Sequence, residues 1–113
     1  MSEDKRYESF QAFFPFYLSE HSDPVNRALH YCGSIGVVST LIYAFVSLNF
    51  WWLLAIPFIG YGPAWVGHFI VEKNRPATFT YPKWSLWGDF KMLGLFLTGR
   101  LKHHLPKKAE ERV

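Results

Sequence analysis

The sequence predicts an all-α integral membrane protein, a helical bundle with a central transmembrane hairpin at about residues 32–48 and 50–71. Residues 28–71 form a stretch of 44 residues without a single Asp, Glu, Lys or Arg. Only 19% of the chain is charged, against about 25% in an average soluble domain. The two halves of the stretch are about as long as a membrane-spanning helix, and neither has a polar face to meet water. The alternative is the interior of a soluble helical bundle.

An aromatic helix over residues 7–18, interrupted by Pro15, is expected before the hairpin. Four aromatic residues recur at helical spacing and form one apolar stripe. This stripe would pack against the rest of the fold or lie at the membrane interface. Its members are Phe10, Phe13, Phe14 and Tyr17.

The first arm of the hairpin has the residues of a helix start in front of it. Asp23 is of the type that caps a helix N-terminus, and Pro24 fits the first helical position, where its missing N–H costs nothing. A helix that begins there places Asn26 and His30 on one face, four residues apart. His21 lies just ahead, in the expected turn.

The second arm is expected to be kinked or split, because it contains Pro57 and a Gly- and Pro-rich segment at residues 60–63. A separate half-helix over residues 64–73 would follow this break. His68 and Glu72 are four residues apart in that half-helix, so they are predicted to share a face.

The basic residues around the hairpin predict its orientation. Arg27 precedes the charge-free stretch and Lys73 and Arg75 follow it, whereas the turn at Asn49 has no basic neighbour. The positive-inside rule therefore places both termini in the cytosol and the turn across the membrane. That membrane would be the inner membrane of a bacterium or the endoplasmic reticulum of a eukaryote.

A third apolar segment, residues 85–101, is interrupted by Asp89 and Lys91 and is too short to span alone. We expect it to form an interfacial or bundle-packed amphipathic helix. Residues 1–101 would then make a single membrane-embedded domain, and residues 102–113 a basic, disordered tail. The tail is short and lacks interleaved aromatic residues, so nucleic-acid binding is not expected.

Three histidines are candidates for chemistry because they lie beside or inside apolar segments, where an ionisable group is expensive. They are His21, His30 and His68, and the hairpin would bring its two ends to the same membrane depth. Together with Glu72 they form a ligand set suited to Fe, Zn or Ni, and two histidines with one carboxylate suit non-haem Fe(II). The alternative is interfacial histidines that are hydrogen-bonded to backbone or lipid headgroups.

Two blocks of residues lie at the ends of the hairpin. They read His21-x-x-Pro24-x-Asn26-x-x-x-His30-x-x-Gly33 and Gly67-His68-x-x-x-Glu72-Lys73-x-Arg75-Pro76-Ala77. The two blocks together resemble a family of small membrane proteins, that of the yeast-type Fe(II)-dependent dioxygenase of 2-hydroxy fatty acids. They match in order and are specific together, and with the hairpin they cover about residues 17–101.

The resemblance implies an Fe(II) enzyme that uses O2 to cleave the C1–C2 bond of a 2-hydroxy fatty acid, leaving an acid shortened by one carbon. It implies metal-associated His21, His30 and His68, with Glu72 as a further ligand or as a residue that orients His68. Asn26 would hydrogen-bond within the site, and Arg75 would hold the substrate carboxylate.

Other functions remain open at this point. The metal site could serve another lipid oxidation or hydroxylation. The chain could also be a membrane-embedded lipid-binding or structural hairpin protein without catalysis, and the sequence is compatible with a homo-oligomer.

Overall fold

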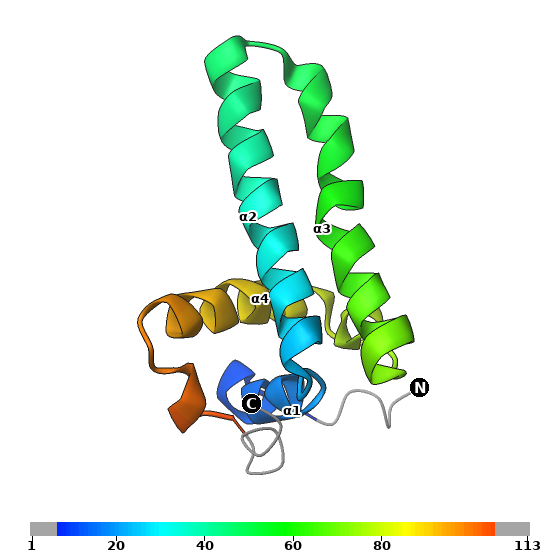
Figure 1. Ribbon diagram of the computed structural model, residues 1–113, viewed down its shortest axis with the longest axis vertical. Coiled ribbons are helices and arrows are strands. Elements are labelled where there is room, and N and C mark those ends of the chain that lie inside the picture. Colours follow the sequence, from blue (N-terminus) through cyan, green and yellow to red (C-terminus); the bar gives the residue numbers. More distant parts are fainter. Residues whose placement is uncertain (1–6, 106–113) are drawn as a thin grey trace.

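The computed structural model describes residues 7–105, and every regular element in this range is helical, which confirms the predicted all-α class. Figure 1 shows α2 and α3 running side by side as a tall column that stands on a base made by α1 and α4. The α-helices are α1 (Phe10–Ser19), α2 (Pro24–Ser47), α3 (Ile56–Val66) and α4 (Pro82–Leu97). The shorter elements are the 3-10 segments η2 (Phe50–Ala55), η4 (Ala77–Phe79) and η5 (Leu101–His103), and the π-helical segment η3 (Gly67–Glu72).

Helix α2 begins as the sequence predicts. The Asp23 carboxylate accepts a hydrogen bond of 2.8 Å from the Val25 N–H, and Pro24 occupies the first helical position. The helix ends at Leu48, whose φ of 58° is left-handed. Asn49 then accepts a hydrogen bond from the Trp51 N–H and starts η2. The chain therefore reverses direction within a very short turn.

The predicted break at residues 60–63 is wrong, because α3 continues through Pro63. The backbone geometry changes at two other places, from 3-10 to α at Ile56 and from α to π at Gly67. Gly33 and Gly60 instead allow close packing of the two arms: a Cβ on Gly33 of α2 would lie 3.0 Å from the Gly60 carbonyl oxygen, and a Cβ on Gly60 would lie 3.1 Å from Val37 Cγ2. Small residues at such a crossing let two helix backbones approach.

The base of the molecule holds most of the buried apolar side chains. Pro15 does not interrupt α1, since both Pro15 and Gln11, whose carbonyl loses its donor, lie on the exposed side. The buried apolar side chains form one hydrophobic cluster, which packs α1 against α4 and η5. Its members are Phe13, Phe14, Tyr17, Leu18, Tyr31, Ala77, Tyr81, Met92, Leu95 and Leu101.

The C-terminal part differs from the prediction in its boundaries. Helix α4 starts three residues earlier than expected and ends four residues earlier, at Leu97. Leu101 is buried and holds η5 against the base, so Lys102 and His103 are helical rather than part of a disordered tail. Residues 106–113 of the predicted tail lie outside the described residues.

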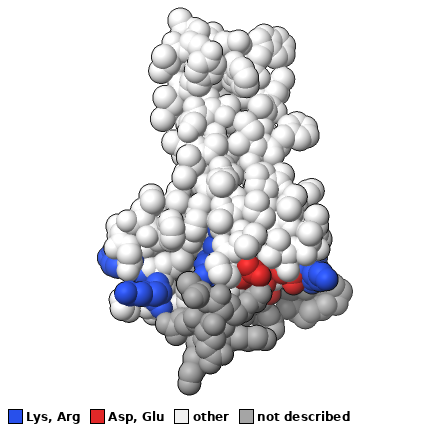
Figure 2. Space-filling view, viewed as in Figure 1, with Lys and Arg blue, Asp and Glu red and all other residues white. Residues whose placement is uncertain are grey.

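Two continuous helices, Pro24–Ser47 and Phe50–Glu72, are long and apolar enough to span a membrane. Only 28% and 17% of their most apolar windows are buried, whereas an interior helix of a soluble bundle is mostly buried. Figure 2 shows the acidic and basic side chains at the base and none on the column. The column thus presents an apolar surface to its surroundings.

Candidate metal centre

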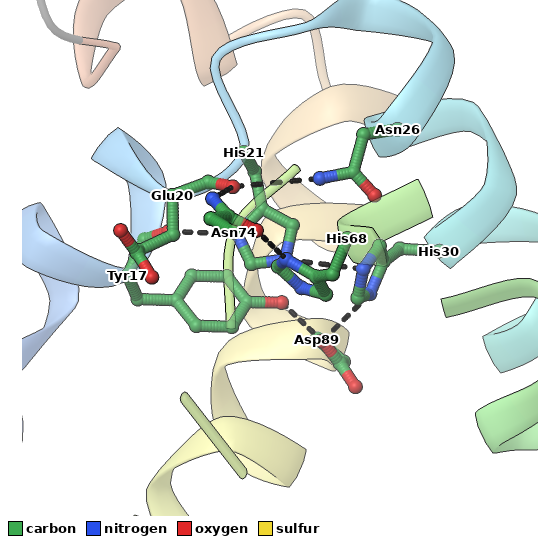
Figure 3. A network of polar contacts seen from close by, with 8 residues as sticks. All are labelled: Tyr17, Glu20, His21, Asn26, His30, His68, Asn74 and Asp89. Atoms are coloured by element: carbon green, nitrogen blue, oxygen red, sulfur yellow. Dashed lines mark hydrogen bonds and ion pairs between the residues drawn. The ribbon is translucent and has the colours of Figure 1, made fainter. Parts of the chain in front are cut away.

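The three candidate histidines converge where the column meets the base. His21 comes from the turn after α1, His30 from the second turn of α2 and His68 from η3. One ring nitrogen from each lies within 4.8 Å of the other two, and the Nε2 atoms of His21 and His30 are 3.2 Å apart. Figure 3 shows the three rings facing one another. The structure therefore brings together ligand atoms that are 47 positions apart in sequence.

Two of the rings are each held by an oxygen atom, which contacts the ring nitrogen that points away from the centre. His21 Nδ1 lies 2.7 Å from the Tyr17 carbonyl oxygen, and His68 Nδ1 lies 2.7 Å from the Asn74 side-chain oxygen. These oxygens only accept hydrogen bonds, so each ring donates from Nδ1 and keeps its Nε2 lone pair for the centre. Metal-binding histidines are held in this way.

The third ring, His30, faces a carboxylate. Its Nδ1 lies 3.3 Å from Asp89 Oδ1, an ion-pair distance without the alignment of a hydrogen bond. The Tyr17 hydroxyl donates a hydrogen bond to the same carboxylate oxygen. Burial, together with the nearby Asp89 charge, raises the pKa of Tyr17 well above its usual 10.0, so the phenol remains a donor. Asp89 thereby connects α1, α2 and α4 beneath the histidines.

Asn74 holds His68 by two contacts. Asn74 was not identified as a site residue from the sequence. The Asn74 N–H donates to the His68 carbonyl oxygen at 2.8 Å, in addition to the side-chain contact with the ring. The Asn74 amide nitrogen donates to the Glu20 carbonyl oxygen at 3.1 Å, which settles which end of the amide faces His68. Lys73, with a φ of 60°, makes the turn that places Asn74 there.

The centre is shielded from water. His21, His30 and His68 have 1%, 6% and 2% of their surface exposed. Burial, and then the proximity of the other two rings, lowers the pKa of His21 well below its usual 6.5. The neutral ring is the form that binds metal. Arg27 fixes the turn around His21, because its Nη1 donates to the carbonyl oxygens of His21 and Ser22 at 2.8 and 3.1 Å.

The other predicted site residues lie around the centre rather than in it. Asn26 is fully buried, and its amide nitrogen lies 3.4 Å from the Glu20 carbonyl oxygen. Its side-chain oxygen has no hydrogen-bond partner and sits against Gly67. Arg75 is exposed, with its guanidinium 5.2 Å from the centre of the Phe79 ring. Arg75 lines neither the small cavity between the histidines nor the larger cavity that adjoins it between α2, α3 and α4.

The Glu72 carboxylate does not join the three histidines. It accepts hydrogen bonds from the Ser22 hydroxyl, at 3.1 Å, and from the Asp23 N–H. The N-terminus of α2 attracts this carboxylate, because the free N–H groups and the helix dipole favour negative charge there. Glu72 therefore ties the end of the second arm to the start of the first. The carboxylate that does lie beside a histidine is Asp89.

The donor set and the space between the rings fit a metal ion. Ligand nitrogens at about 2.1 Å from one ion are about 3.0–3.4 Å apart at tetrahedral or octahedral angles, and the His21–His30 separation of 3.2 Å agrees. A small cavity of about 20 Å³ lies against all three histidines, enough for one water-sized species. Among residues 7–105, the group that could hold a metal consists of these three histidines, and a site with three protein ligands leaves positions for exogenous molecules.

The fold and the site together define a class: a small all-helical protein with two apolar, spanning-length helices and three buried histidines that could hold a metal. A family model described as 2-hydroxy-palmitic acid dioxygenase Mpo1-like matches residues 7–101, and the chain belongs to this family. The match confirms the resemblance carried by the two sequence blocks. Neither the curated proteins nor the solved structures provide a significant match.

Proposed function

We propose that this protein is a membrane-embedded, iron-dependent dioxygenase that cleaves the C1–C2 bond of 2-hydroxy fatty acids. The observation that carries the proposal is the buried convergence of three histidines in a chain of this family. With carbon 1 leaving as CO2, one O2 converts the 2-hydroxy acid into the acid shortened by one carbon plus one water. This balance needs no external reductant.

The residues of the centre would divide the work between holding the metal and orienting its ligands. His21, His30 and His68 would hold Fe(II), which when bound supplies the redox chemistry with O2. The Tyr17 carbonyl and the Asn74 amide fix the rings of His21 and His68. Asp89, 3.3 Å from His30 Nδ1, would offset the positive charge of a metal ion held by that ring. Glu72 and Asn26 would support the site indirectly. Glu72 accepts a hydrogen bond from the Asp23 N–H and Asn26 packs against Gly67, and both contacts join the two helices of the column at its base.

We further infer that the column is a transmembrane hairpin and that α1 and α4 lie at the membrane interface. Helix α2 has 24 residues, which at about 1.5 Å per residue exceeds a hydrocarbon core of about 30 Å. Residues 28–71 carry no charged side chain, and the charged side chains visible in Figure 2 lie at the base of the column. The basic flanks favour the cytosolic side for the base and both termini.

The test uses full-length protein in lipid nanodiscs. The protein is loaded with Fe(II) under anaerobic conditions, and 2-hydroxypalmitate and O2 are then added. We expect bound iron near one per chain, and the acid shortened by one carbon as the product seen by mass spectrometry. His30→Ala should lose iron and reduce turnover at least about 100-fold. His103→Ala is the matched control, since His103 is exposed, and should change neither.

Two results would count against the proposal in different ways. Iron-loaded wild type that leaves 2-hydroxypalmitate intact would remove the substrate assignment but keep the metal site. Equal iron content in the His30 and His103 variants would remove the metal site itself. The protein would then be better described as a lipid-binding or structural hairpin.

A further inference from the structure

A second, larger cavity adjoins the metal centre. It has a volume of about 260 Å³ and lies between α2, α3 and α4. Four residues line both this cavity and the small one between the histidines: His30, Tyr61, Thr78 and Asp89. The two spaces therefore meet at the same group of side chains.

The cavity changes from polar to apolar along the column. His30, Thr78 and Asp89 line its end at the base, whereas Val37 and Ile56 line it further along α2 and α3. Seven residues separate His30 from Val37, which corresponds to about 10 Å along the helix axis. A molecule with a polar head and an alkyl tail matches this order, with the head beside the histidines.

The charges around the cavity also indicate how a head group would sit. Among the described residues, neither Arg nor Lys lines the cavity, and Asp89 contributes a carboxylate. A carboxylate head would therefore find its opposite charge only in a cation held by the histidines. This arrangement leaves Arg75, on the surface beside Phe79, without a role in binding the head.

Helix α4 forms the outer wall of the cavity. Leu86 and Phe90 of this helix line it, and both side chains are also exposed on the outside, by 59% and 38%. The wall is thus thin and apolar on both sides. A lipid in the surrounding hydrocarbon would meet Leu86 and Phe90 on its way in.

We propose that this cavity binds the part of the substrate's alkyl chain nearest to the head group along the hairpin, with Val37 at the end where a longer chain leaves the cavity. The inference rests on the proposed function for the identity of the head group. Gly33 and Gly60 form part of the lining, and a Cβ on Gly60 would be 3.1 Å from Val37 Cγ2. A larger side chain at position 37 has little space toward Gly60 of α3, and we expect it to extend into the cavity.

Photo-crosslinking tests where the chain lies. The probe is 2-hydroxypalmitate with a diazirine in mid-chain, added to full-length, Fe(II)-loaded protein in nanodiscs without oxygen. We expect the label on residues that line the cavity, around Val37 and Ile56, and expect excess 2-hydroxypalmitate to prevent it. Labelling spread over exposed residues such as Val46 and Phe58, without competition, would overturn the assignment.

Val37→Phe tests whether a long chain passes position 37. It should lower kcat/KM for 2-hydroxypalmitate at least about tenfold relative to 2-hydroxyoctanoate, because the larger side chain blocks the end of the cavity that only the longer chain has to pass. Val38→Phe is the matched control, since Val38 is exposed and absent from the lining, and should leave the ratio unchanged. An equal ratio in both variants, or equal loss with both substrates, would overturn the role of Val37.

The two measurements separate this inference from the proposed function. Competed labelling inside the cavity in a protein that oxidises no 2-hydroxy acid would retain the cavity and reject the reaction. Normal oxidation with labelling outside the cavity would retain the reaction and reject the cavity.

Discussion

At the scale of single residues, the orientation of a histidine in the centre depends on the ring nitrogen that faces away from the centre. A histidine whose Nδ1 donates to a fixed oxygen has one orientation and one available lone pair. Asn74 provides such an oxygen for His68, and its own amide nitrogen is held by the Glu20 carbonyl. His68 is therefore oriented by a chain of contacts that reaches back to the end of α1.

Asn74→Ala should weaken metal binding about 10- to 100-fold, because the His68 ring loses the partner that fixes its orientation and tautomer. The measurement is the Kd for Co(II), a spectroscopic substitute for Fe(II), in detergent. The Asn74 backbone bond to the His68 carbonyl remains in this variant, so the fold should persist. Asn49→Ala at the distant turn is the control and should bind Co(II) normally. Equal affinity in both variants would show that Asn74 does not orient His68.

The sequence revealed the histidines but only part of their surroundings. An ionisable residue inside an apolar segment is unusual, and this criterion alone selects His30 and His68. The same criterion also selects Asp89, which we expected merely to interrupt an apolar segment. Asn74 carries no such signal, because a polar residue in a loop is ordinary. The position of Glu72 depends on its attraction to the start of α2, a tertiary contact that spacing along one helix cannot show.

At the scale of elements, the two arms are held together at the base by close packing around Gly67. A Cβ on Gly67 would lie 1.8 Å from Asn26 Oδ1 and 3.3 Å from the Asn26 Cα. The clash involves backbone as well as side chain, so the first turn of α2 would have to move. Gly67 is also where α3 changes to the π-helical η3, one residue before His68. Local π segments in helices are often found at functional sites.

Gly67→Ala should therefore destabilise the protein by about 1–3 kcal/mol, as expected for overpacking a tight contact. Gly62→Ala is the matched control, because a Cβ there meets nothing within 4 Å. It should instead stabilise α3 by about 0.5–1 kcal/mol through helix propensity. Thermal unfolding in detergent would measure both. Opposite signs support the packing argument, and a stabilising Gly67→Ala would contradict it.

The elements differ in how far a sequence pattern could predict them. The start of α2 was predictable because a cap and a proline act locally. The continuity of α3 was not, since Gly60 and Pro63 also occur where helices break. In this chain Gly60 lies close against α2, and α3 continues through Pro63. Leu101 likewise extends the ordered base beyond the predicted domain, through burial that its local sequence does not indicate.

At the scale of the whole molecule, the apolar column and the charged base require different surroundings. The column exposes large apolar side chains over most of its length, including Val46, Leu54 and Phe58. In water such a surface would promote aggregation, whereas in a bilayer it needs no further protein contact. The three histidines lie where the two parts meet, which under the proposed function places the site between the membrane lipid and the aqueous side.

A hairpin that crosses the bilayer places its turn and its base on opposite sides. Cys32 is the only cysteine, so Cys32→Ser provides a background for Asn49→Cys at the turn and Lys102→Cys at the base. In sealed vesicles of one orientation, a membrane-impermeant maleimide should label one of these positions from outside. The other should react only after the membrane is opened. If the base lies in the cytosol, inside-out vesicles will expose Lys102→Cys. Labelling of both positions from one side would mean that the column lies along the membrane or in a protein interface, even if the metal centre is intact.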